Sequence, residues 1–352
     1  MNIAIFVKNL TSGGAEKQSV LLAKALSDCY ETHYIIFNGE KVHQKYMDML
    51  MADSKIRIQY FRGRHGARYT DFVKYLKDNN IKAIFSYLTA ANFYACMAGK
   101  EVKAKVFTGL RNAELPVFKC IADRMLTNRF AEMAISNSYS GKLNFVAKGF
   151  KEDKIIVIPN CFESIKPYNE KPTRRILHII TVGRFVPQKD YETAIHAIAY
   201  LKKKCCNIAF DIVGYGELEA QIRKLINKYY IDDITSIYIN PNNIAELLDN
   251  ADIYLSTSLF EGTSNSIMEA MNADLPIVAT NVGDNSQLVR NNVNGFLCDK
   301  KDWENIATKL EFLVKNDNLR KKNGEESKRL LRANYSMDKF RQSYVNFLLK
   351  YM

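Results

Sequence analysis

The sequence predicts an α/β protein of two domains, each built on a Rossmann-like, doubly wound parallel sheet. Three observations lead to this prediction. The chain has 352 residues, enough for two domains of ordinary size. Short β-branched runs alternate with amphipathic stretches in both halves, as in parallel sheets covered by helices. The chain also opens with a strand-like run, a glycine pair and a helical stretch to Leu26, the order in which a doubly wound domain begins.

The first half supplies most of the expected elements of one such domain. Gly13 and Gly14 follow the first strand, and glycines there would let the backbone approach a ligand closely at a helix start. A plain tight turn is the alternative, since the dinucleotide motif G-x-G-x-x-G is absent. The expected strands are residues 2–7, 34–37, 56–61, 83–87, 105–108 and 133–138, with helical stretches at 72–76 and 91–97.

The second half begins after a polar, proline-containing segment at residues 163–175, which predicts a linker. The tail from Glu304 to Tyr351 is expected to be helical. The predicted domains are residues 1–165 and 166–335, followed by a last helix over residues 336–352. Further strands are expected at 176–182, 210–213, 237–240 and 252–258.

The stretch from Phe260 to Glu269, F-E-G-T-S-N-S-I-M-E, has the clearest site character. A strand-like run precedes it and a helical run follows, so residues 263–266 should form the turn into a helix. The free N–H groups at a helix start bind anions, above all phosphate. Glu261 and Glu269 would repel phosphate directly, so we expect them to accept hydrogen bonds from hydroxyls beside it, such as those of a sugar and a ribose flanking a diphosphate. The alternative is a loop carboxylate and a solvated helix residue.

Charge is distributed unevenly along a chain of otherwise ordinary globular composition. The net charge is +12, and residues 1–170 hold 25 Lys and Arg against 16 Asp and Glu, a net +9. This asymmetry favours an anionic partner for the first half: nucleic acid, a membrane surface or a phosphorylated substrate. Five cations contribute to it: Lys55, Arg57, Arg62, Arg64 and Arg68. They form either a solvated basic loop or a contact for anionic lipid or diphosphate. No apolar run reaches the length of a membrane span, and a cytoplasmic protein is expected.

The region F-E-G-T-S-N-S-I-M-E-A-M-N-A-D-L-P-I-V-A-T-N-V-G-D resembles the E-x7-E region of the family-four (group 1) retaining glycosyltransferases of the GT-B superfamily. Similar motifs occur in the family's order along nearly the whole chain. They are G-G-A-E after the first strand, K-I-I-V-I-P-N-C-F-E at 154–163, G-R-F-V-P-Q-K-D at 183–190 and the G-x-G turn at 214–216. Three positions depart from the family pattern, because Cys161, Asp274 and Asp284 stand where relatives usually have glycine.

The resemblance implies a GT-B architecture, in which two Rossmann-like domains face a central cleft and the last helix crosses back to the first domain. The second domain would bind the nucleotide sugar, and Arg184 and Lys189 would clamp the leaving diphosphate and act with Glu261 in catalysis. The acceptor is expected at Arg111, Asn112, Arg62 and Arg64. The full set of expected donor contacts is Gly13, Gly14, Gly183, Arg184, Lys189, Gly214, Gly216, Glu261, Gly262, Thr263, Ser264, Asn265, Ser266 and Glu269.

The implied activity is retaining transfer of a sugar from a nucleotide diphospho-sugar, with UDP the expected nucleotide. A polyprenyl-diphosphate-linked oligosaccharide of capsule, O-antigen or another surface polysaccharide is the expected acceptor. No cofactor or metal is expected, and the sequence has no D-x-D motif. The expected partners include an anionic membrane surface, contacted peripherally at the inner face of the cell membrane, and exclude nucleic acid. A sugar-nucleotide epimerase or a phosphorylase of the same fold remains an alternative, and a basic nucleic-acid-binding protein is the least supported one.

Overall fold

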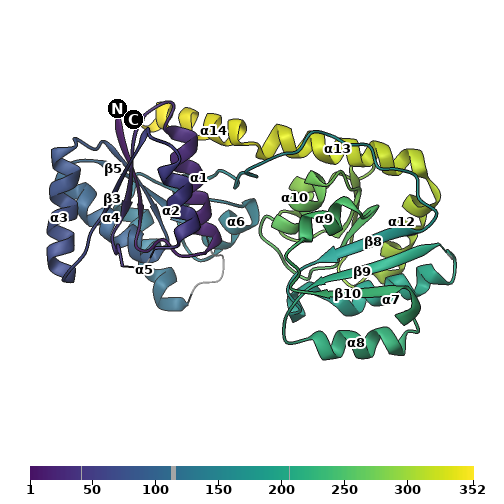
Figure 1. Ribbon diagram of the computed structural model, residues 1–352. Helices are drawn as coiled ribbons and strands as arrows, with labels where there is room; N and C mark the ends of the chain where they lie inside the picture. The colour runs from purple at the N-terminus through teal and green to yellow at the C-terminus, as the bar shows by residue number, and fades with distance from the viewer. Residues whose placement is uncertain (41, 112–115, 206) are drawn as a thin grey trace. The chain divides into compact units, whose positions relative to one another are not determined.

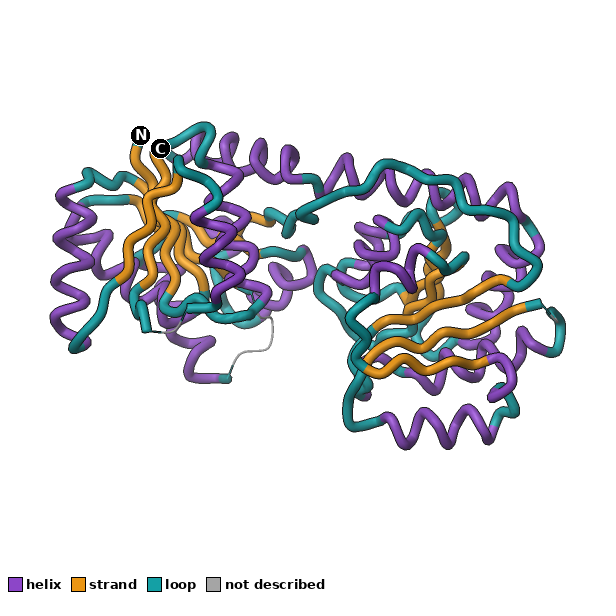
Figure 2. The backbone as a smooth tube through the Cα atoms, in the orientation of Figure 1, coloured by secondary structure: helices purple, strands orange, loops and turns teal. Residues whose placement is uncertain are grey.

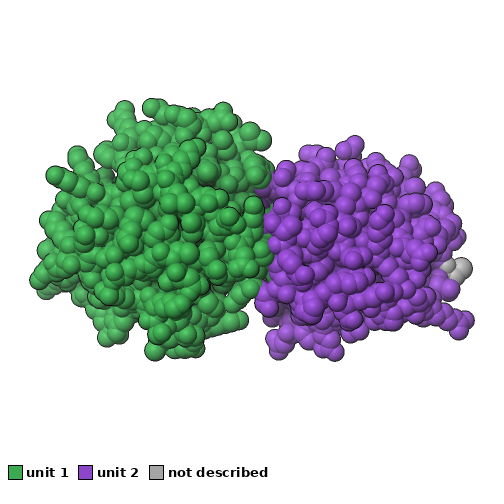
Figure 3. Space-filling model, turned by 90° about the horizontal axis from the view of Figure 1, so that it is seen from above, with its two compact units in different colours: residues 1–163, 335–352 green, residues 164–334 purple. Residues whose placement is uncertain are grey.

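The computed structural model describes residues 1–40, 42–111, 116–205 and 207–352, which form two compact units. Unit 1 comprises residues 1–163 and 335–352, and unit 2 comprises residues 164–334 (Figure 3). Each unit contains one parallel sheet with helices on both of its faces (Figure 2). The predicted α/β class, with two doubly wound sheets, is confirmed.

The sheet of unit 1 has the order β3-β2-β1-β4-β5-β6-β7. Figure 1 shows this sheet between helices α1 and α2 on one side and α3 on the other. Chain order reverses between β1 and β4, and Ile3 of β1 pairs with both Thr32 and Ala83. Such a switch point opens a crevice at the carboxyl ends of the strands, where doubly wound folds bind ligands. The strands are β1 (Asn2–Val7), β2 (Glu31–Ile36), β3 (Ile56–Tyr60), β4 (Ala83–Tyr87), β5 (Lys105–Leu110), β6 (Met133–Ser136) and β7 (Ile155–Val157).

The two faces of this sheet bury alternate residues of the same strand. Ile3 and Ile5 pack in one core with α1, α2 and α14, whereas Ala4 and Phe6 pack in the other with α3 and α4. The helices are α1 (Gly14–Leu26), α2 (Gln44–Met51), α3 (His65–Asp78), α4 (Thr89–Val102), α5 (Val117–Arg129), α6 (Tyr139–Ala147) and α14 (Met337–Tyr351), with a 3₁₀ turn η1 (Glu152–Lys154). No helix of the described residues is long and apolar enough to cross a membrane.

The sheet of unit 2 has the order β10-β9-β8-β11-β12-β13, with its switch point between β8 and β11. Its strands are β8 (Leu177–Val182), β9 (Ile208–Gly214), β10 (Thr235–Ile239), β11 (Ile253–Ser256), β12 (Ile277–Thr280) and β13 (Gly295–Cys298). Its helices are α7 (Tyr191–Lys202), α8 (Glu219–Lys228), α9 (Ile244–Asp249), α10 (Asn265–Asn272), α11 (Asn285–Leu288), α12 (Trp303–Lys315) and α13 (Asp317–Tyr335), with 3₁₀ turns η2 (Pro187–Lys189) and η3 (Asp232–Ile234).

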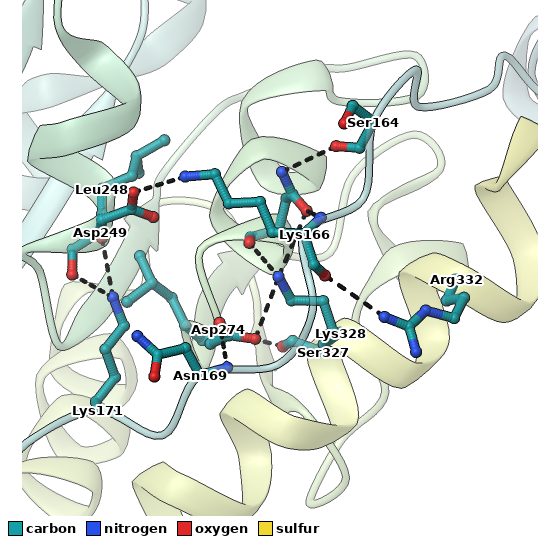
Figure 4. A network of polar contacts seen from close by, with 12 residues as sticks. Ser164, Lys166, Asn169, Lys171, Leu248, Asp249, Asp274, Ser327, Lys328 and Arg332 are labelled. Carbon is teal, nitrogen blue, oxygen red and sulfur yellow. Dashed lines mark hydrogen bonds and ion pairs between the residues drawn. The ribbon is translucent and has the colours of Figure 1, made fainter.

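One departure from the family pattern, Asp274, has a structural explanation. Its φ of +59° lies in the left-handed region, which glycine adopts freely and which aspartate tolerates better than most residues. Its carboxylate lies 3.3 Å from the buried Nζ of Lys328 and accepts a hydrogen bond from the backbone N–H of Asn169. Lys166 and Lys171 add contacts to Asp249, so the segment after residue 163 is fastened to unit 2 (Figure 4).

The prediction of a single basic loop at residues 55–68 is wrong, because its five cations are divided among strand β3, helix α3 and the segments beside them. Arg57 lies on β3 and pairs with Glu31 at 2.6 Å, and Lys55 pairs with Asp28 at the same distance. Helix α3 begins at His65 and therefore includes Arg68, whose guanidinium lies 5.5 Å from the ring centroid of Phe37. Arg62 and Arg64 lie exposed in the short connection between β3 and α3, and Lys55 and Arg57 are exposed as well but ion-paired.

Candidate functional site

Two loops meet at the switch point of unit 2. One follows β8 and runs from Gly183 to the turn η2, and the other follows β11 and leads to α10. Backbone and side-chain hydrogen bonds join them, since Leu259 N–H donates to the Gln188 carbonyl and Gln188 Nε2 donates to the Phe260 carbonyl, both at 2.8 Å. The Thr257 hydroxyl also lies within 3.0 Å of the Lys189 carbonyl. The two loops therefore form one connected surface at the carboxyl edge of the sheet.

An ion pair between Lys189 and Glu261 lies in this surface. Lys189 Nζ is 2.6 Å from Glu261 Oε1, and the two side chains are only 18% and 10% exposed. The Ser258 hydroxyl donates to the same carboxylate oxygen at 2.8 Å. Sequence reasoning selected Lys189 and Glu261 separately and did not foresee this pair. The lysine offsets the negative charge of Glu261, which removes much of the repulsion that a nearby phosphate would otherwise meet.

The helix that starts beside Glu261 has the geometry of an anion site. Helix α10 begins at Asn265, and the Ser264 side chain caps it by accepting from Ile267 N–H at 3.4 Å. The N–H groups of Asn265 and Ser266 have no partner within the helix, because the first turn of any α-helix leaves its donors free. The sequence predicted a turn over residues 263–266. Thr263 and Ser264 precede the helix, whereas Asn265 and Ser266 are its first two residues.

Glu269 lies on α10 near the tyrosine at the floor of the site. Tyr254 is buried on β11, and burial raises the pKa of its hydroxyl. The hydrogen bond with Ser266 lowers that pKa, and the carboxylates of Glu269 and then Glu261 raise it. Both glutamates thus lie near the same tyrosine, one from the loop and one from the first turns of the helix.

Arg184 differs from Lys189 in its surroundings. It is exposed, and no ion pair or hydrogen bond of its guanidinium is found among the described residues. It follows Gly183 directly after β8, on the same loop as Lys189. A long, exposed guanidinium on this loop suits an anion that arrives from solvent.

The glycines of the G-x-G turn pack closely against the loop after β8, and their contact with a donor stays a prediction. A Cβ on Gly214 would lie 1.9 Å from the Gly183 carbonyl oxygen, and one on Gly216 would lie 2.6 Å from the Phe185 carbonyl oxygen. These glycines are therefore required for close packing of the chain's own two loops. Gly283 is similar, since its Cβ would lie 1.9 Å from the Glu261 carbonyl oxygen, and Asp284 beside it is buried and lies 3.4 Å from the Thr263 hydroxyl. Sequence reasoning missed these supports.

A cavity of about 570 Å³ opens at the switch point of unit 1. It lies at the carboxyl ends of β1, β4 and β5 and is lined mainly by apolar and aromatic side chains, including Phe93, Phe118 and Met125. Asp123 is buried in its wall and accepts hydrogen bonds from Thr89 at 2.6 Å and from Asn92 at 3.1 Å. Burial raises the pKa of Asp123. A pocket of this size and character suits a substrate with apolar parts.

Arg111 lines this cavity, but its guanidinium mainly contacts other side chains of the protein. Its terminal nitrogens donate to Asn160 Oδ1 at 3.1 Å and to the Tyr344 hydroxyl at 3.4 Å, and its guanidinium lies 4.6 Å from the Tyr87 ring centroid. Its Nε is buried with no partner among the described residues. Arg111 thus fastens α14 and the I-P-N-C segment to the end of β5, and acceptor contact by Arg111 stays a prediction. Asn112 lies outside the described residues.

The glycine pair of unit 1 lies where the sequence predicted, at the start of α1. Gly13 precedes the helix, and a Cβ there would lie 2.3 Å from Glu16 Oε2, whereas a Cβ on Gly14 would meet nothing within 4 Å. Glu16 is buried and accepts a hydrogen bond from Thr11 at 2.7 Å. Glycine at position 13 therefore avoids a clash with the Glu16 carboxylate, which lies against it. Position 14 has open space around it at the helix start. No group of three or more metal-binding side chains occurs in the described part of the chain.

The fold and its two switch points define a protein of the GT-B class. Residues 162–330 match the model of the family described as glycosyl transferases group 1, in agreement with the resemblance inferred from the motifs. An uncharacterized glycosyltransferase of Haemophilus influenzae is 27% identical over 98% of this chain and 99% of its own length. The crystal structure of Anabaena HepE in complex with UDP has a TM-score of 0.81 at 18% identity, covering 99% of this chain and 100% of that one.

A further relative has a more specific name. It is the GalNAc-alpha-(1->4)-GalNAc-alpha-(1->3)-diNAcBac-PP-undecaprenol alpha-1,4-N-acetyl-D-galactosaminyltransferase of Campylobacter jejuni, 23% identical over 91% of both chains. Its name places its acceptor glycan on a lipid diphosphate. The present chain is similar to this enzyme over most of its length.

Proposed function

We propose that this chain transfers a sugar from a UDP-sugar to a lipid-linked oligosaccharide during synthesis of a surface polysaccharide, with retention of anomeric configuration. The observation that carries the proposal is the Lys189–Glu261 pair beside the start of α10. It combines a cation, a hydroxyl-binding carboxylate and free helix amides within one small surface. The relatives named for UDP and for an undecaprenol-linked glycan supply the nucleotide and the acceptor class.

Each residue has a distinct part in the proposed donor complex. The diphosphate lies at the first turn of α10, where helix amides and the cations of Arg184 and Lys189 stabilise its charge. Glu269 accepts hydrogen bonds from the ribose hydroxyls, and Glu261 accepts them from the sugar. Lys189 already contacts Glu261, so it positions that carboxylate and faces the leaving phosphate at the same time.

The proposed chemistry needs no group beyond these residues and the two substrates. The bond between the anomeric carbon and the phosphate oxygen breaks, and the acceptor oxygen bonds to that carbon on the same face. The acceptor's hydroxyl proton passes to the departing phosphate oxygen, so UDP leaves with the proton. Cationic side chains and helix amides stabilise the growing negative charge, which is the largest contribution expected of such a site.

The test is a donor panel followed by product analysis. UDP-, GDP-, ADP- and dTDP-sugars are added to the purified chain, and the melting temperature is recorded. A ligand at a hundred times its Kd stabilises the folded state by about 2.7 kcal/mol. We expect a UDP-sugar to give the largest shift and UDP release to require the lipid-linked acceptor. An α-linked product from an α-linked donor is expected by NMR. An inverted product, or UDP release that is unaffected by acceptor, would contradict the proposal.

A further inference from the structure

Two tyrosine hydroxyls hold the end of β8. Tyr191, the first residue of α7, donates from its hydroxyl to the Gly183 carbonyl at 2.8 Å. Tyr254 of β11 donates to the preceding carbonyl, that of Val182, at 3.3 Å. Both tyrosines are buried, and burial raises the pKa of each hydroxyl, so both remain protonated donors. Two consecutive carbonyls at the start of the loop that carries Lys189 are thus fixed from two different elements.

Gly183 lies between the Tyr191 hydroxyl and the Lys189 side chain. A Cβ on Gly183 would lie 3.1 Å from Lys189 Cε, 3.3 Å from its Cδ and 3.4 Å from the Tyr191 hydroxyl oxygen. The aliphatic stem of Lys189 therefore packs against the backbone of Gly183, close to the space that a side chain would need. Because Lys189 Nζ reaches Glu261 at 2.6 Å from this position, the place of Gly183 helps to set where the ammonium lies.

The backbone of Lys189 is fixed separately from its side chain. The buried Thr257 hydroxyl lies 3.0 Å from the Lys189 carbonyl oxygen and 2.9 Å from that of Asp190. The Asp190 side chain in turn caps α7 by accepting from the Thr193 N–H at 3.4 Å. With the main chain held in this way, the remaining freedom of Lys189 is that of its long side chain. Packing of the stem against Gly183 reduces this freedom.

The hydroxyl of Tyr191 is not needed for packing of the ring. The ring meets the buried Phe185 edge-on, with 5.2 Å between centroids, inside the hydrophobic core of unit 2. A phenylalanine would fill the same space, and burial of a hydroxyl is unfavourable unless the hydroxyl is hydrogen-bonded. The hydroxyl therefore acts on the loop after β8, through the Gly183 carbonyl.

We propose that Tyr191 is a positioning residue for sugar transfer. Its hydroxyl holds Gly183, and Gly183 in turn supports the stem of Lys189. The ammonium then lies against Glu261, where it stabilises the charge that grows on the departing diphosphate. The proposal rests on the proposed function for the identity of that diphosphate. Tyr191 is buried and acts through Lys189 rather than by touching a substrate.

Tyr191→Phe tests the proposal, because it removes the hydroxyl and keeps the ring. Turnover is measured as UDP release in the presence of acceptor. We expect kcat to fall by about tenfold, since misplacement of a charge-stabilising group slows the chemical step. The KM for the UDP-sugar should change by less than about threefold, because helix amides and other side chains of the site also bind the donor.

A double-mutant cycle separates positioning from general damage to the fold. In the Lys189→Met background, Tyr191→Phe should lower kcat by less than about twofold, since it acts through a side chain that is already absent. The matched control is Tyr34→Phe, which removes a buried hydroxyl that shares a hydrogen bond with Ser19 at 2.7 Å in unit 1. The control should leave kcat unchanged in both backgrounds. Melting temperatures of all variants report their folding.

Gly183→Ala tests the same contact from the other side. Its Cβ intrudes on the stem of Lys189 while the Tyr191 hydroxyl is kept, so kcat should again fall in the wild-type background and change little beside Lys189→Met. This variant decides the question where Tyr191→Phe does not fold. Three results would each overturn the proposal: wild-type kcat in Tyr191→Phe, an equal loss in Tyr34→Phe, or a tenfold loss that persists beside Lys189→Met.

Crystal structures of wild type and Tyr191→Phe separate this inference from the proposed function, because they do not depend on activity. We expect Lys189 Nζ to lie beyond hydrogen-bond distance of Glu261 in the variant. If wild type transfers sugar and the variant keeps both the contact and the rate, the positioning role is wrong and the transferase function stands. If wild type releases no UDP from any nucleotide sugar, the proposed function fails, and the structures alone decide whether Tyr191 positions Lys189.

Discussion

The two sheets have the same kind of switch point, yet the surfaces built on them differ. At the switch point of unit 2, charged and polar side chains are paired, and loops approach so closely that Gly214 and Gly283 leave no room for a Cβ. At the switch point of unit 1, a cavity of about 570 Å³ is lined by aromatic and aliphatic side chains. One topology therefore supports a compact surface of paired charged and polar side chains and an open, mostly apolar pocket. The difference teaches that the loops and their side chains, and not the sheet order, determine the chemical character of each switch point.

The largest effect should follow from removing a donor contact in unit 2. Glu269→Ala and Arg184→Ala should each lower turnover by roughly 10²–10³-fold, since loss of one such contact costs about 2.7–4 kcal/mol of barrier. Turnover is measured as UDP release in the presence of acceptor, and folding is checked by melting temperature. Arg175→Ala, an exposed arginine of unit 2 that lies outside the proposed site, is the matched control for charge. Activity of either site variant at the wild-type level would refute the assignment of the site.

The packing difference predicts that glycine substitutions in the two units change stability by unequal amounts. Gly214→Ala should destabilise unit 2 by about 3 kcal/mol or more, because the new Cβ would overlap the Gly183 carbonyl oxygen. Gly14→Ala should change stability by less than about 1 kcal/mol, since its Cβ enters open space at a helix start. Urea denaturation of both variants measures the contrast. Equal effects would show that the two loops are packed alike.

The Lys189–Glu261 pair should act as a unit. A double-mutant cycle with Lys189→Met and Glu261→Gln should give a coupling free energy of about 1–3 kcal/mol in stability. Removal of either side chain leaves the other mostly buried and without its oppositely charged partner. The exposed pair Arg57–Glu31 of unit 1 is the control and should couple by about 0.5 kcal/mol or less. A coupling near zero at Lys189–Glu261 would mean that the pair does not organise the site.

Burial of Asp123 predicts a small pH effect in unit 1. Because burial raises its pKa, the folded chain binds more protons than the unfolded chain between the ordinary carboxyl pKa and the raised one. Stability relative to Asp123→Asn should therefore fall as pH rises from the ordinary carboxyl pKa to the raised pKa of Asp123, and then stay constant. Melting temperatures across this range measure it. A relative stability that rises with pH would contradict the direction of the shift.

The smallest expected effect is that of chelation. The proposed site stabilises phosphate with Arg184, Lys189 and helix amides, so EDTA should leave the rate of UDP release unchanged. A rate that falls with EDTA and returns on addition of manganese or magnesium would require a metal in the donor site.

Local features of the fold could be predicted from the sequence because they depend on neighbouring residues. The run before Phe260, the glycine at 262 and the apolar spacing after Ser266 were sufficient to predict strand, turn and helix where β11 and α10 occur. The start of α3 was missed, since Arg64 precedes it in place of a Ser, Thr, Asp or Asn cap.

Contacts between distant segments could not be predicted in this way. Lys189 and Glu261 are 72 residues apart and meet only because β8 and β11 are neighbours across the switch point. The partners of Arg111 lie 49 and 233 residues further along the chain, so its role in fastening α14 is invisible to a local pattern. The G-x-G turn was recognised in the sequence. The close packing of its glycines against the loop after β8 is visible only in the structure.

The most direct test of the account is a crystal structure of the chain grown with UDP. The account predicts diphosphate oxygens within hydrogen-bond distance of the Asn265 or Ser266 N–H and the ribose hydroxyls on the Glu269 carboxylate. Lys189 should contact the phosphate or remain on Glu261 beside it. UDP bound in the cavity of unit 1, with the start of α10 empty, would contradict the division of ligands between the two switch points.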